Sequence, residues 1–119
     1  MRVILTGYGA MLRALAEGIL NSKHEIAGVF LHENVKNSRL RNFFNHISNP
    51  SGDYMFAKSH GLYQIAADSV NSEKFRQAVK DLKADAVITG SWSEKFSMQT
   101  INTIPNGFIN VHPSLLPKY

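Results

Sequence analysis

Short apolar runs of strand length alternate along this chain with stretches of helical periodicity. The first run, residues 2–6, is followed by a stretch from Met11 to Leu20 in which apolar residues recur at i, i+3, i+4, i+7 and i+8. Residues 26–31 then form a continuous apolar run, which is typical of a parallel strand covered by helices on both faces. This order predicts a strand, a helix and a second strand that pairs parallel to the first.

The alternation continues to the end of the chain. Further strands are predicted at residues 63–65, 86–89 and 108–111. Three further helical segments are predicted. They are residues 54–60, a helix that begins after an N-cap at Ser72, and residues 98–104. Residues 34–53 mix polar and aromatic side chains and predict a partly helical excursion.

The predicted fold class is α/β, with a Rossmann-like, doubly wound and mostly parallel sheet of about five strands. We expect one domain over residues 1–119. Parallel strands need right-handed crossovers, and ligands of such sheets bind at the carboxyl ends of the strands. The candidate site is therefore expected where strands end and loops begin.

Composition excludes several classes of protein. The chain has no cysteine, so disulfides and thiolate chemistry are excluded, and its histidines lack metal-ligand spacing, so no metal is expected. The 13 Lys and Arg against 9 Asp and Glu give a net charge of +4, which favours anionic ligands without the dense basic runs of a nucleic-acid-binding arm. No run approaches the ~20 apolar residues of a membrane helix. We predict a cytoplasmic protein with neither nucleic acid nor membrane as partner.

Polar side chains gather where the last predicted strand ends. Asn110 and His112 are two residues apart, so on a strand they would point to the same face. A carboxamide can donate to a developing oxyanion, and an imidazole, which titrates near neutral pH, can carry a proton beside it. The pair suits acyl transfer to an amine. Taken singly, each residue is better explained by a structural role, as a turn-side amide or a partly buried imidazole bonded to the backbone.

The segment around this pair, Asn110-Val111-His112-Pro113-Ser114-Leu115-Leu116-Pro117, resembles the signature loop of the formyltransferases that use 10-formyltetrahydrofolate. The resemblance implies that 10-formyltetrahydrofolate is the formyl donor. It also implies that Asn110 holds the tetrahedral oxyanion and that His112 assists electrostatically and in proton movement. Both residues are then catalytic.

The same resemblance implies further contacts. The loop after the fourth strand would border the pterin with Trp92, Ser93, Glu94, Lys95 and Phe96. The first turn and the signature loop would lie near the acceptor with Gly7, Tyr8, Gly9 and Ser114. The acceptor is expected to be a small or nucleotide-linked amine, a class that includes amino sugars. The alternative for the later loop is an ordinary strand exit whose tryptophan packs in the core.

The family's third catalytic residue, an aspartate that orients the histidine, lies downstream of the signature loop. This chain ends at Tyr119, without that aspartate and without the Arg-Gly that usually follows the loop. We therefore expect little formyl-transfer activity from these residues alone. An apolar sheet edge left uncovered would also permit self-association.

Two other functional hypotheses compete with formyl transfer. A nicotinamide-binding Rossmann domain would use the glycines after the first strand and Glu33 after the second, but Leu12 breaks the G-x-G-x-x-G fingerprint. A non-catalytic nucleotide-binding or regulatory module is the other alternative. Continuation of the parent sequence past Tyr119 into Arg-Gly and a later aspartate would favour the enzyme.

Overall fold

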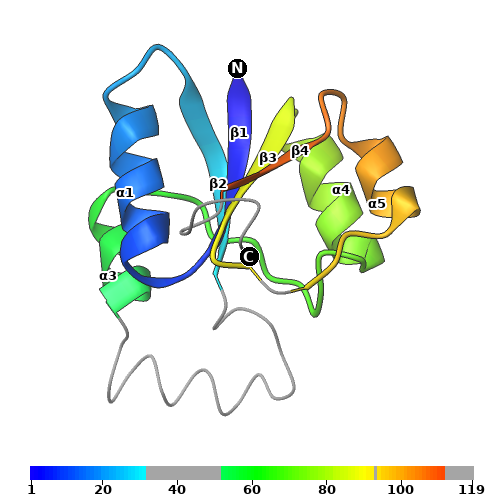
Figure 1. The fold of residues 1–119 in the computed structure, drawn as a ribbon, viewed down its shortest axis with the longest axis horizontal. Coiled ribbons are helices and arrows are strands. Elements are labelled where there is room, and N and C mark those ends of the chain that lie inside the picture. Colours follow the sequence, from blue (N-terminus) through cyan, green and yellow to red (C-terminus); the bar gives the residue numbers. More distant parts are fainter. Residues whose placement is uncertain (32–51, 93, 112–119) are drawn as a thin grey trace, which may run out of the picture.

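A computed structural model describes residues 1–31, 52–92 and 94–111 of the chain. The sheet has four parallel strands in these ranges, in the order β2-β1-β3-β4. They are β1 (Arg2–Gly7), β2 (Glu25–Leu31), β3 (Ala86–Gly90) and β4 (Phe108–Val111). The order, in which β1 lies inside the sheet and the chain winds outward in both directions from it, confirms the predicted doubly wound class (Figure 1).

Helices cover both faces of this sheet. On one side lie α1 (Gly9–Leu20) and α3 (Gly52–Ser59), and on the other lie α4 (Glu73–Asp81) and α5 (Met98–Thr103), as Figure 1 shows. Because strand side chains alternate between faces, each helical layer has its own apolar cluster. Leu5 and Val29 join the cluster below α1, whereas Ile4, Phe30 and Val87 join the one below α4.

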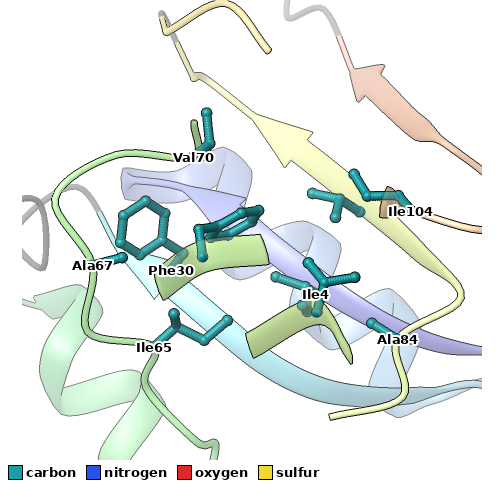
Figure 2. Packing of buried hydrophobic residues seen from close by; sticks show 10 residues of the cluster. Ile4, Phe30, Ile65, Ala67, Val70, Ala84 and Ile104 are labelled. Carbon is teal, nitrogen blue, oxygen red and sulfur yellow. The ribbon is translucent and has the colours of Figure 1, made fainter. Parts of the chain in front are cut away.

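The cluster on the α4 side is held by aromatic packing. The Phe30 and Phe75 rings are fully buried, with centroids 5.3 Å apart. Figure 2 shows side chains from β1, β2 and the segment before α4 meeting around Phe30. Burying a phenylalanine side chain stabilises a fold by about 1.5–3 kcal/mol, so this pair is a main anchor of α4 to the sheet.

Serine caps set where α4 and α5 begin. The Ser72 hydroxyl accepts a hydrogen bond from the Phe75 N–H at 3.2 Å, which confirms Ser72 as the N-cap of α4. Ser97 accepts from the Thr100 N–H at the same distance and begins α5. A cap of this kind contributes about 1 kcal/mol. The helices predicted at 54–60 and 98–104 are also confirmed, as α3 and α5.

The strand predicted at residues 63–65 was wrong. This segment meets the sheet by one bridge, in which Val29 N–H donates to the Tyr63 carbonyl and Ile65 N–H donates to the Val29 carbonyl, both at 2.8 Å. Ladder pairing ends there because the chain turns to bury Ile65 and Val70 in the α4-side cluster. The described sheet therefore has four strands and one bridge, where about five strands were predicted.

Some expectations fall outside the described ranges or stay untested. Of the predicted excursion at 34–53, only the last two residues are described, and they begin α3. The β4 strand is an edge of the described sheet, and its Ile109 side chain is 51% exposed. Self-association through such an edge stays a prediction. No helix in the described part of the chain is long and apolar enough to span a membrane.

Candidate functional site

A row of side chains crosses the sheet close to its carboxyl end. The strand register pairs Phe30 with Thr6, Thr6 with Thr89, and Thr89 with Asn110. Partners in a parallel sheet point to the same face, so these four residues, which we call the rim row, all face the α4 side. The row changes from aromatic to polar on passing from β2 to β4.

Asn110 is tied to its neighbour in the rim row. The Thr89 hydroxyl donates to the Asn110 Oδ1 atom at 2.8 Å, and it also approaches the Ile109 carbonyl at 3.5 Å. Thr89 is buried, whereas the Asn110 side chain is exposed. A buried hydroxyl therefore holds an accessible carboxamide at the end of β4.

Beside this pair is a cavity of about 360 Å³ between the β3 exit and β4. Its walls are Thr89, Trp92, Glu94, Lys95, Phe96, Phe108 and Asn110. The Phe96 and Phe108 rings stack with centroids 4.5 Å apart and planes 10° from parallel. Flat apolar walls with a few polar groups at one end are typical of small-molecule sites.

The loop after β3 is anchored by hydrogen bonds to the segment before α4. The Glu94 carboxylate accepts from the Val70 N–H at 3.1 Å and from the Ser69 hydroxyl. The Asn71 carboxamide donates to the Lys95 carbonyl at 2.8 Å and accepts from the Ser97 N–H at 2.7 Å. Glu94 thus borders the cavity while its carboxylate holds the loop in place.

The Trp92 side chain contacts both the α4-side cluster and the cavity. Its ring lies 5.4 Å from the Phe30 ring and packs against the α4-side cluster, as the structural alternative predicted. It also borders the cavity, and its predicted contact with the pterin stays a prediction. Of the five predicted pterin-loop residues, four therefore line the cavity, and Ser93 lies outside the described residues.

The turn after β1 lies at the same carboxyl end of the sheet, but away from the cavity. Gly7 and Gly9 both have positive φ, 142° and 71°, which confirms the tight turn expected there. The Gly9 N–H donates to both carboxylate oxygens of Asp53, at 2.9 and 3.1 Å, and Asp53 also pairs with Arg13 at 2.9 Å. None of Gly7, Tyr8 and Gly9 lines the cavity beside Asn110.

Several predicted site residues cannot be placed. His112 and Ser114 lie outside the described residues, so their roles and the shared face of Asn110 and His112 stay predictions. In the described part of the chain, no group of three His, Cys, Asp or Glu side chains could hold a metal ion.

The sequence analysis did not identify three residues described above, two at the cavity and one at the turn after β1. Thr89 was visible as a polar residue at the end of an otherwise apolar strand, which is a weak signal for a site. Phe108 was assigned only to a strand. Asp53 gave no signal, because its partner Gly9 is 44 residues away.

These features define a class. The chain is an open, doubly wound α/β protein whose cavity lies at the carboxyl ends of two neighbouring parallel strands, where ligands of this class bind. A family model described as formyl transferase matches residues 1–119. The chain therefore belongs to the formyl transferase family.

Relatives by sequence are methionyl-tRNA formyltransferases. The protein from Kosmotoga olearia is 27% identical over 119 residues, which are 100% of this chain and 37% of that protein. The one from Lachnospira eligens is 26% identical and is covered to 36%. The chain thus spans little more than a third of these relatives.

Solved structures with the same fold are phosphoribosylglycinamide formyltransferases. The structure from Anaplasma phagocytophilum superposes with a TM-score of 0.69 at 22% identity, covering 100% of this chain and 52% of that one. The one from Bacillus halodurans gives 0.68 at 18% identity, covering 98% and 58%. At these identities the likeness supports the fold alone.

Proposed function

We propose that the cavity between β3 and β4 binds the formyl-bearing part of 10-formyltetrahydrofolate, and that the formyl group passes to an amine. The observation that carries the proposal is the position of Asn110. In a chain of the formyl transferase family, its carboxamide lies at the rim of a cavity with a stacked aromatic wall. The chain spans little more than a third of the relatives whose names carry a formyltransferase activity, so the complete reaction is part of the proposal.

The chemistry assigns Asn110 one task. The amine nitrogen attacks the formyl carbon, a new C–N bond forms, and the carbonyl oxygen becomes an oxyanion. The Asn110 amino group donates a hydrogen bond to that oxygen, which lowers the barrier. The amine then loses a proton, the bond to the folate nitrogen breaks, and tetrahydrofolate leaves with a proton on that nitrogen. His112 is proposed to assist the proton movement.

The cavity suits the donor in size and character. Its volume, about 360 Å³, lies within the ~300–1,000 Å³ range of small-molecule sites. Phe96 and Phe108 offer flat apolar surface to the aromatic part of a folate, and Lys95 offers a cation at the rim. The net charge of +4 favours a donor that carries carboxylates.

The acceptor is proposed only as a class, a small or nucleotide-linked amine. The names of the relatives indicate two acceptors, a methionyl-tRNA and a phosphoribosylglycinamide, and both carry a primary amine. An amino-sugar acceptor, a cytoplasmic location and self-association stay proposals from the sequence. A dinucleotide-binding role is less well supported, since the Gly9 N–H at the first turn already binds the Asp53 carboxylate.

The proposal is tested by comparing two folates on the same chain. Under oxygen-free conditions, 10-formyltetrahydrofolate and tetrahydrofolate are titrated separately, and amide shifts are followed by NMR. We expect saturable binding with shifts at Lys95, Phe96 and Phe108. Asn110→Ala should cut the preference for the formylated folate about fivefold, the value of one hydrogen bond.

Asn106→Ala is the matched control. It removes the same side chain from the turn before β4, at the other end of that strand, where the side-chain amide lies 3.5 Å from the Met1 sulfur. The preference should be unchanged. Absence of saturable binding, or shifts gathered at the separate hollow beside Tyr63 and Leu82, would refute the proposed site.

A further inference from the structure

We propose that Thr89 is a positioning residue for Asn110: its hydroxyl selects which end of the carboxamide faces the cavity. The relevance of this role to catalysis rests on the proposed function, whereas the hydrogen bond itself does not. Thr89 itself donates nothing to the reacting atoms. It acts through Asn110.

The register makes this contact specific. Thr89 and Asn110 are direct partners in the β3–β4 ladder and point to the same face. The Oγ1 to Oδ1 distance is 2.8 Å, the usual length of an O–H···O hydrogen bond. Thr89 is only 2% exposed, so little water competes for its proton.

The two ends of a carboxamide are chemically opposite. The Nδ2 end donates and stabilises an oxyanion, whereas the Oδ1 end accepts and would repel it. Because Oδ1 is bound to the Thr89 hydroxyl, the planar group turns Nδ2 away from Thr89. The hydroxyl thereby presents the useful end of the amide.

Packing alone does not fix this choice. Asn110 is exposed on β4, and its chain neighbour Ile109 is also exposed on the other face. An exposed Asn side chain loses rotamer entropy when it is held in one geometry. The directional hydrogen bond from the buried Thr89 hydroxyl offsets this loss.

The rim row supplies an internal control. Thr6 is the β1 partner of Thr89, is the same residue type and is equally buried. Among the described residues, its hydroxyl has no hydrogen-bond partner. Changing Thr6 therefore alters a hydroxyl in the same row without touching Asn110.

The test compares Thr89→Val with Thr89→Ser by NMR on the ligand-free chain. Nuclear Overhauser effects from the Asn110 amino protons report which end of the carboxamide faces the cavity, and three-bond couplings of the side chain report whether it occupies one χ1 rotamer. We expect one rotamer in the unchanged chain, in Thr89→Ser and in Thr6→Val, and averaged couplings in Thr89→Val. A merely structural role for Thr89 would lower the melting temperature but leave these couplings alone.

Folate binding gives the second readout. Thr89→Val should lose the preference for 10-formyltetrahydrofolate over tetrahydrofolate by about fivefold, as Asn110→Ala does, and Thr89→Ser should keep it. If the unchanged chain binds neither folate, the proposed function fails, while the coupling data still decide the role of Thr89. The two failures are thus distinguishable.

Two results would overturn the inference. One is a single Asn110 rotamer in Thr89→Val with the amino group still facing the cavity. The other needs no variant: a strong nuclear Overhauser effect between the Thr89 hydroxyl proton and the Asn110 amino protons would mean that the amide is reversed. This second measurement decides the question even if Thr89→Val does not fold.

Discussion

The segments that follow β1 and β4, their exits, both lie at the carboxyl end of one sheet, yet they use their polar groups in opposite ways. At the β1 exit, the Asp53 carboxylate accepts hydrogen bonds from both the Gly9 N–H and the Arg13 guanidinium. At the β4 exit, the Thr89–Asn110 pair borders a cavity. One exit is closed by the chain itself, and the other is open to a ligand.

The difference separates a structural site from a functional one. The N-terminus of α1 attracts anions, and the position a ligand anion would take is filled by Asp53. Any acceptor contact at Gly7, Tyr8 or Gly9 therefore has to use groups other than the Gly9 N–H. At the open exit, the Asn110 carboxamide accepts a hydrogen bond from the Thr89 hydroxyl and is exposed beside the cavity.

The largest effect is expected at Gly7, where the end of β1 lies against the end of β3. Gly7 pairs with Gly90 at a φ of 142°, and a Cβ atom there would overlap the Gly90 carbonyl oxygen. We expect Gly7→Ala to lower the free energy of unfolding by more than about 4 kcal/mol, or to prevent folding. Urea denaturation followed by circular dichroism measures it.

Gly9→Ala is the matched control for that change. Gly9 also has a positive φ, 71°, but a Cβ atom there meets nothing within 4 Å. Only the backbone cost should remain, about 1–2 kcal/mol. Equal losses for the two variants would mean that the close approach of the β1 and β3 exits does not constrain the fold.

A smaller loss is expected when the closed exit is opened. Asp53→Ala removes the acceptor of the Gly9 N–H and the partner of Arg13, and charged hydrogen bonds of this kind contribute about 1.5–3 kcal/mol. We expect a loss of about 2 kcal/mol in urea denaturation, with the folate-induced shifts at Phe96 and Phe108 unchanged.

Asp81→Ala tests whether that loss is specific. Asp81 is an exposed carboxylate that accepts a hydrogen bond from Gln77, one helical turn away, so its removal should change stability by no more than about 0.5 kcal/mol. If the two aspartates cost the same, the β1 exit is not closed as described. If Asp53→Ala moves the folate shifts, the two exits are coupled.

The same contrast explains what the sequence could predict. Strands and helices follow from local periodicity, so the fold class and the Ser72 cap were confirmed. The contact of Asp53 with Gly9 spans 44 residues, and no local pattern encodes it. The Thr89–Asn110 bond depends on the register between β3 and β4, which neither strand's own pattern determines. Local signals therefore predict where a site lies, but not how its side chains are held.

The smallest effect is expected within the rim row, at Thr6. Its hydroxyl is fully buried and has no hydrogen-bond partner in the described part of the chain, so it carries a desolvation cost without a compensating bond. Thr6→Val replaces it with a methyl group of similar size, and we expect the free energy of unfolding to stay the same or rise by up to about 1 kcal/mol. Thr89→Val, which breaks a bond at the next position in the row, should lower it by a similar amount. A destabilised Thr6→Val would mean that the Thr6 hydroxyl has a hydrogen-bond partner. The hydrogen-bonded part of the rim row would then include β1 as well as β3 and β4.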